Sequence, residues 1–98
     1  MMKLSNFEPI KKDYGIGTQI VLDFGKYHLS VITGGHGHAE APYEIAVFNA
    51  NNGVAGAFVQ LAGITGPDDD VRGYMTNDEV NAIIMKMFVI TGKQPEQV

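Results

Sequence analysis

One stretch near the C-terminus, residues 76–92, decides the fold: TNDEVNAIIMKMFVITG. Thr76 is a natural N-cap, and Glu79, three residues later, completes the pattern of a capping box. Gly92 is a typical C-terminal stop. Between these two signals, apolar residues recur at the spacing of a helix that buries one face, and they are Val80, Ile83, Ile84, Met87 and Phe88.

Upstream of this helix, short runs of alternating apolar and polar residues predict antiparallel strands. A hairpin is predicted over 18–33, with Gly25-Lys26 at its turn. Two further strands are predicted over 43–49 and 54–61, and a short fifth one over 71–75. The sequence therefore predicts an α+β fold: a four- or five-stranded antiparallel meander with one C-terminal helix packed on one face.

The 98 residues leave room for a single domain. We expect residues 1–17 to form an extended lead-in, because Pro9 disfavours a helix there, and residues 93–98 to form a frayed tail. The predicted core combines alternate strand positions with the helix stripe. It consists of Ile20, Leu22, Leu29, Val31, Ile45, Val47, Phe58, Val80, Ile83, Ile84, Met87 and Phe88.

Charge and composition exclude several classes of protein. The formal charge of −4 lacks the basic footprint on which nucleic-acid affinity depends, so no nucleic-acid partner is expected. No apolar run approaches the ~18–20 residues of a membrane span. The N-terminus lacks the apolar core of a signal peptide, so secretion by that route is not expected. The absence of cysteine excludes disulfides and thiolate metal sites.

The back of the predicted helix is apolar as well as its front. Ala82, Met85 and Val89 lie about half a turn from the core stripe, where a solvated helix would carry charges. Scattered exposed apolar residues are common on protein surfaces. The alternative is that a second copy of the chain or another protein covers this line. These three residues are one predicted partner-binding site.

A second candidate for partner binding is acidic. Asp68, Asp69 and Asp70 stand together in a predicted loop after Gly66-Pro67. A solvated surface loop explains them in the simplest way. A binding surface for a basic partner, steered by charge, is the functional alternative.

Only one segment has the residue types of a metal site. His36, His38 and Glu40 are two residues apart, so an extended chain would point all three side chains the same way. Two imidazoles and a carboxylate suit zinc or non-haem iron. However, the surrounding Gly and Ala residues predict a mobile loop over 34–42 that holds no ligand. No other cofactor is expected.

Part of the chain resembles a loose class of small phage-encoded accessory proteins of unknown function. The resemblance is carried by Tyr43-Glu44-Ile45-Ala46-Val47-Phe48, by Asp69-Asp70-Val71-Arg72-Gly73-Tyr74-Met75-Thr76 and by the helix opening Asn77-Asp78-Glu79-Val80. It implies a protein made in the bacterial cytoplasm that binds and blocks a host or defence protein. It supplies no site residues.

The leading hypothesis is therefore a small, non-enzymatic protein-binding protein, acting as a phage inhibitor. A homodimer is expected, because a single helix covers one sheet face and leaves Val21, Ile32 and Phe48 on the other. One alternative is a small-ligand or metal-binding protein that uses the His36/His38/Glu40 loop. A self-assembling structural component of a virion is the other.

Overall fold

The computed structural model of the chain describes residues 2–12, 17–51 and 54–98. It is an α+β fold with an antiparallel sheet and one α-helix near the C-terminus, which confirms the predicted class. The elements are the 3-10 helix η1 (Leu4–Asn6), β1 (Ile10–Lys11), β2 (Thr18–Asp23), β3 (Tyr27–Ile32), β4 (Tyr43–Asn51), β5 (Val54–Phe58), β6 (Val71–Met75), α1 (Asn77–Thr91) and β7 (Glu96–Gln97).

The strands follow the predicted meander, because β1 to β5 are neighbours in the sheet in the order of the chain. The hairpin register joins Ile20 to Val31, and Leu29 lies opposite Val47 on the next strand. The long strand β4 pairs with β6 through its first half and with β5 through its second half. The short strand β7 pairs with β2 at the opposite edge.

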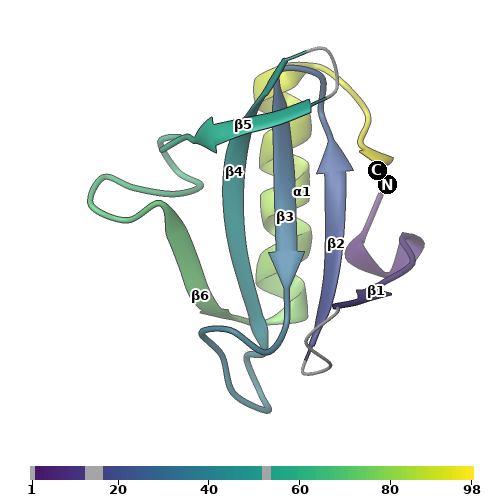
Figure 1. Cartoon of the computed structure of the whole chain (residues 1–98), viewed down its shortest axis with the longest axis vertical. Coiled ribbons are helices and arrows are strands. Elements are labelled where there is room, and N and C mark those ends of the chain that lie inside the picture. The colour runs from purple at the N-terminus through teal and green to yellow at the C-terminus, as the bar shows by residue number, and fades with distance from the viewer. Residues whose placement is uncertain (1, 13–16, 52–53) are drawn as a thin grey trace.

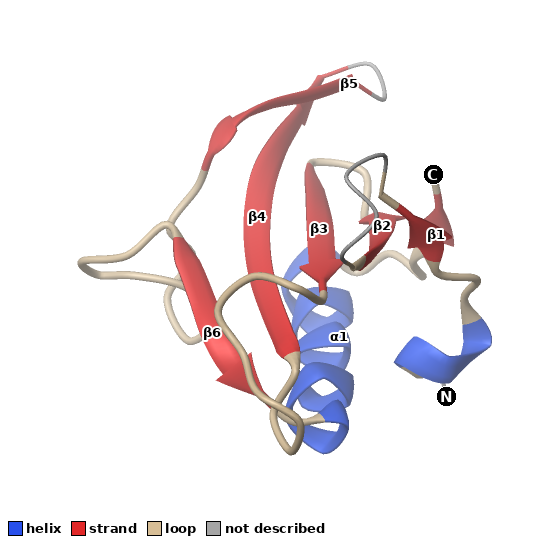
Figure 2. Ribbon diagram, turned by 60° about the horizontal axis from the view of Figure 1, so that its bottom comes forward, coloured by secondary structure: helices blue, strands red, loops and turns tan. Residues whose placement is uncertain are grey.

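The two faces of the sheet are covered differently. Helix α1 runs along the back of β3 and β4, while β5 turns across the front of the sheet (Figures 1 and 2). The turn of β5 coincides with a register shift between Phe48 and Ala50 on β4. Such a bulge bends a strand and increases its twist, and here it directs β5 over the face that α1 does not cover.

The core lies between the sheet and α1, and most of the predicted core residues are buried there. Two predictions are wrong. Phe58 is 49% exposed, because the register shift turns β5 out of the plane of the core. Phe88 is 37% exposed, because it lies at the margin of the helix stripe, about 100° beyond Met87. The core also contains Leu4, Phe7, Phe24, Ile64 and Met75, which the prediction did not include.

Both ends of α1 are stabilised as the sequence predicts. Thr76 Oγ1 accepts a hydrogen bond from the Glu79 amide at 3.2 Å, and Glu79 Oε1 accepts one from the Thr76 amide at 2.9 Å. At the other end, Gly92 has a positive φ of 67° and its amide donates to the Phe88 carbonyl at 2.7 Å. The helix bounds are therefore fixed by local chemistry.

The N-terminal and C-terminal segments contact each other through Glu8 and Gln97. The predicted frayed tail is wrong for the last residues, since β7 pairs with β2 and Pro95 is buried. The Gln97 side chain also accepts from the Glu8 amide at 2.9 Å and donates to the Glu8 carbonyl. In the predicted lead-in, η1 and β1 are ordered elements, and residues 1 and 13–16 lie outside the described residues.

Candidate functional site

The outer face of α1 is the side turned away from the sheet. Successive helix residues are turned by about 100°, which places Asp78, Ala82, Met85 and Val89 opposite the core stripe. The side chains that face the sheet are fully buried, and they are Val80, Ile83, Ile84 and Met87. Ala82 and Val89 are exposed and Met85 is half-buried. The structure therefore brings the three predicted helix residues together on one apolar line.

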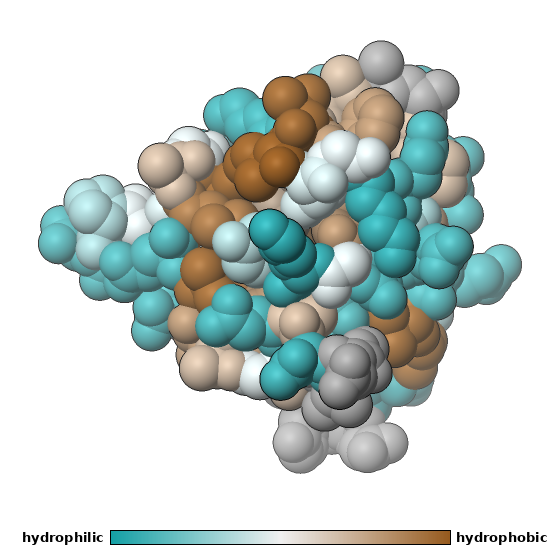
Figure 3. Space-filling model, turned by 90° about the horizontal axis from the view of Figure 1, so that it is seen from above, coloured by the Kyte–Doolittle hydropathy of each residue, from teal (hydrophilic) through white to brown (hydrophobic). Residues whose placement is uncertain are grey.

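This apolar line widens toward the end of the helix. Three consecutive large apolar residues are exposed there: Phe88 at 37%, Val89 at 77% and Ile90 at 49%. Consecutive helix residues point in different directions, so the last turn is apolar on several sides at once. Figure 3 looks onto this end of the molecule, and hydrophobic side chains reach the surface on the helix side, at the top of the view.

A shallow groove lies beside the line. It has a volume of about 40 Å³ and is lined by side chains from the N-terminal segment, α1 and the C-terminal segment: Met2, Ile84, Met85, Phe88, Gln94 and Pro95. We call Ala82, Met85, Phe88 and Val89, together with this groove, the outer surface of α1. Methionine is well suited to such a surface, because its flexible side chain adapts to different partners.

Charged residues lie beside the outer surface of α1. Asp78 and Glu79 lie in the first turn of α1, where the helix dipole favours acids. Hydrogen bonds from the Thr76 backbone and side chain lower the pKa of Glu79, with a smaller contribution from Arg72. Lys86 Nζ donates to the Gly63 carbonyl at 3.3 Å, and the Lys93 side chain, beyond the C-cap, lies next to Gly25 in the turn between β2 and β3.

The predicted acidic site does not join this surface. Asp68, Asp69 and Asp70 are exposed on the loop between β5 and β6, which projects away from the body of the sheet (Figures 1 and 3). Asp70 accepts a hydrogen bond from the Gln60 side chain at 3.2 Å, and the Asp69 carbonyl accepts from the Gly66 amide. The acids therefore form a separate polar surface.

The predicted metal ligands are not assembled around one point. His36 Nδ1 contacts Glu44 Oε1, and the same oxygen accepts from the His36 amide at 3.0 Å. His38 Nδ1 instead lies 3.3 Å from the backbone amides of Glu40 and Ala41. Across the described residues, no three His, Asp or Glu side chains are placed to hold a metal ion together. Glu44 is thus a partner of His36 that the spacing argument missed.

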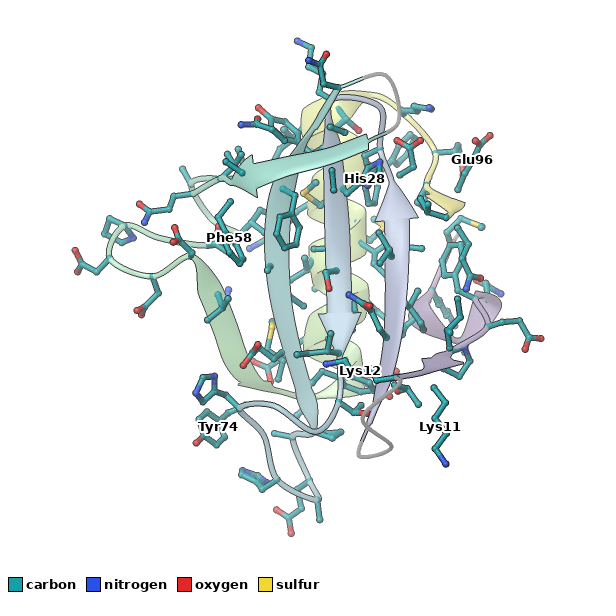
Figure 4. All side chains as sticks on the ribbon, viewed as in Figure 1. Lys11, Lys12, His28, Phe58, Tyr74 and Glu96 are labelled. Carbon is teal, nitrogen blue, oxygen red and sulfur yellow. The ribbon has the colours of Figure 1, made fainter. Side chains whose placement is uncertain are left out.

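The loop over residues 34–42 is held against β6, in contrast to the mobile loop that its composition predicts. The Tyr74 amide donates to the His36 carbonyl at 2.8 Å, and His38 and Ala41 exchange backbone hydrogen bonds at 3.1 Å. A Cβ on Gly73 would lie 2.5 Å from His36 Cβ, so only glycine permits this approach. The rings of His38 and Tyr74 are 5.8 Å apart, and Tyr74 lies at this end of the sheet in Figure 4.

The front face of the sheet holds a hollow of about 210 Å³ that sequence reasoning missed. Its apolar wall includes Ile32 and the ring pair of Phe48 and Phe58, whose centroids are 4.5 Å apart. Its polar wall includes Gln19, whose side chain donates to Ser30 Oγ at 3.0 Å. Phe58 extends from β5 over this face (Figure 4). The hollow forms because β5 bends over this face of the sheet. The alternation of apolar and polar residues along a strand does not predict such a bend.

A buried histidine lies on the same face of β3. His28 is 2% exposed, and its Nε2 atom is 3.7 Å from Asp23 Oδ1. Within the described part of the chain this nitrogen has no hydrogen-bond partner. The face that β5 covers is therefore partly polar, in contrast to the apolar layer under α1.

Comparisons with protein families, with curated proteins and with solved structures found no match to this chain. The described part of the chain contains no helix that is long and apolar enough to cross a membrane.

Proposed function

We propose that this chain is a protein-binding protein and that the outer surface of α1 is its contact surface. One observation carries the proposal: on the side of α1 turned away from the sheet, exposed Phe88 and Val89 adjoin Met85 and the groove that Met85 and Phe88 line. Single exposed apolar residues need no explanation, but a contiguous apolar area is typical of a surface that another protein covers.

The free energy available from covering this surface is substantial. Removing apolar area from water contributes about 25 cal/mol per Å², so large side chains at a protein contact contribute most. The groove lined by Met85 and Phe88 adds a depression into which a partner side chain can insert. Binding energy at protein contacts concentrates in such well-packed anchors.

The more specific predictions rest on the resemblance alone. An inhibitor of a host or defence protein, a phage origin and a cytoplasmic location therefore stay predictions. The acidic loop, the metal site at His36, His38 and Glu40, and the virion component also stay predictions.

Site-specific photo-cross-linking tests the proposal directly. A benzophenone amino acid replaces Val89, or Lys11 as a control, which projects from β1 away from the molecule (Figure 4). Asp69 carries the probe in a third variant to test the acidic loop. Each variant is irradiated both in bacterial cells and as purified protein, and protein adducts are resolved by mass.

We expect the probe at position 89 to give discrete protein adducts at least several-fold above those at position 11. A second substitution, Met85→Glu, should reduce these adducts, because it places a charge in the apolar contact. Equal labelling from positions 89 and 11 would overturn the proposal. Discrete adducts from position 69 alone would also overturn it, since they would move the contact to the acidic loop.

A further inference from the structure

The hollow on the front face of the sheet, which we call the front hollow, has the size and lining of a site for a small molecule. Its volume is about 210 Å³, and its lining includes Ser30 and Ala46, which are paired across β3 and β4. The Phe48 and Phe58 rings also line it, with their planes tilted by 34°. Such a ring pair is an apolar surface on which a third ring can pack.

The aromatic residues and the polar residues lie at opposite ends of the front hollow. Along β4, Phe48 is two residues after Ala46 and Glu44 is two residues before it, so the two ends are ~13 Å apart along the backbone. Gln19 lies at the Glu44 end, because both residues pair with Ile32 in the register of the sheet. A ligand that fills the hollow therefore needs an apolar group at one end and a polar group at the other.

The charged side chains of the polar end are Lys12 and Glu44. Glu44 holds the loop over residues 34–42, since its Oε1 atom accepts from the His36 amide at 3.0 Å and contacts His36 Nδ1. No carboxylate among the described residues pairs with Lys12. Lys12 lies over the sheet in Figure 4, whereas Lys11 projects away from it. The charge that meets a ligand in the front hollow is therefore the positive charge of Lys12.

Ser30 adds a hydrogen-bond donor inside the front hollow. It is 5% exposed, and its Oγ atom accepts from the Gln19 side chain at 3.0 Å. A hydroxyl that accepts one hydrogen bond still has its own hydrogen to donate. Within the described part of the chain this hydroxyl donates to no other group. Lys12 and Ser30 thus both donate hydrogen bonds toward an oxygen-bearing, negatively charged group, and a carboxylate is the simplest of these.

From this arrangement we infer that the front hollow binds a small aromatic monocarboxylate. The ring of the ligand packs against Phe48 and Phe58, and its carboxylate accepts hydrogen bonds from Lys12 and Ser30. The net charge of −4 opposes an anion at long range. Exposed charges farther away than ~8 Å are largely screened at physiological ionic strength, so the nearby Lys12 dominates. This site lies on the face of the sheet opposite α1, so it is independent of the proposed contact surface.

Titrations followed by amide shifts in NMR spectra test this inference with probes of similar shape. Hydrocinnamate carries a ring and a carboxylate, hydrocinnamyl alcohol a ring without charge, phenylpropylamine a ring and an ammonium group, and hexanoate a carboxylate without a ring. Hydrocinnamate should shift the Ser30 and Ala46 amides saturably. Its dissociation constant should be at least about fivefold lower than that of each other probe, because it alone satisfies both ends of the hollow.

Two neighbouring lysines give a matched pair of variants. Lys12→Met should raise the dissociation constant of hydrocinnamate roughly 5- to 10-fold and leave that of hydrocinnamyl alcohol within about twofold, which also shows that the hollow is intact. Lys11→Met removes the same charge from the adjacent residue and should leave both constants within about twofold of wild type. Phe58→Ala should weaken every probe that carries a ring. Thermal unfolding of each variant identifies any loss of folding.

Several results would overturn the inference. One is the absence of saturable shifts with hydrocinnamate up to its solubility limit, and another is saturable shifts confined to α1. Tighter binding of phenylpropylamine than of hydrocinnamate would assign the polar end to Glu44 instead of Lys12. Equal effects of Lys12→Met and Lys11→Met would show that the carboxylate responds only to the overall charge of the chain.

Discussion

The inner and outer faces of α1 are built from the same kind of residue but meet different surroundings. Met87 faces the sheet and is fully buried, whereas Met85, two residues earlier, is half-buried on the outer surface. Ile84 and Val80 pack in the core, while Val89 is largely exposed. An ordinary surface helix changes from apolar to polar between its two faces. Here the outer face stays apolar, and that difference is the basis for the proposed contact.

The two methionines give the sharpest test of this comparison. Met87→Ala should lower the free energy of unfolding by about 2–5 kcal/mol, because it leaves a cavity under the sheet. Met85→Ala should cost less than about 1 kcal/mol, because the shortened side chain opens onto the surface. Both are measured by urea unfolding in a Val89→Glu background, so that self-association does not contribute. Equal losses in the free energy of unfolding would show that Met85 and Met87 are equally well packed and that the two faces of α1 do not differ.

A smaller effect is expected where α1 ends. Gly92 has a positive φ of 67°, and an added Cβ would meet no atom within 4 Å. Gly92→Ala should therefore lower the free energy of unfolding by about 1–2 kcal/mol through the backbone alone. Gly92→Asn should cost less, because asparagine tolerates this conformation. If both variants unfold at the same urea concentration as wild type, helix termination does not depend on this cap.

The smallest expected effect concerns the start of α1 and depends on pH. The Thr76 hydrogen bonds lower the pKa of Glu79 below its ordinary value of 4.5. The ionised side chain therefore stabilises the fold fully above that ordinary value, and this stabilisation is lost as the pH falls through the lowered folded pKa. Glu79→Gln should reduce the unfolding midpoint at neutral pH and approach wild type in acid. If the difference in unfolding midpoint between Glu79→Gln and wild type stays constant from neutral to acid pH, the Thr76 hydrogen bonds are not the cause of the stabilisation.

Local signals predicted the elements of the fold well. The Thr76–Glu79 capping box, the apolar period of α1 and Gly92 are all short-range patterns, and the structure has each of them. The strand alternation also located β2, β3 and β4, because alternate large apolar residues of each strand join the core cluster. On the outer surface, the helical period was enough to place Ala82, Met85 and Val89 opposite the core.

What the sequence did not reveal depends on contacts between distant segments. The bend of β5 removes Phe58 from the core through a register shift on β4. The contact of His36 with Glu44 depends on the loop folding back onto the following strand, and its anchor is the amide of Tyr74 on β6. The tail is ordered by pairing with β2 and by Gln97 reaching Glu8. Periodicity within one segment carries no information about such pairings.

Photo-cross-linking in bacterial cells, with the benzophenone amino acid at position 89 or at position 11, measures most directly whether the outer surface of α1 contacts another protein. We expect discrete protein adducts from position 89 that the substitution Met85→Glu reduces. Equal labelling from positions 89 and 11 would show that this surface is not a contact.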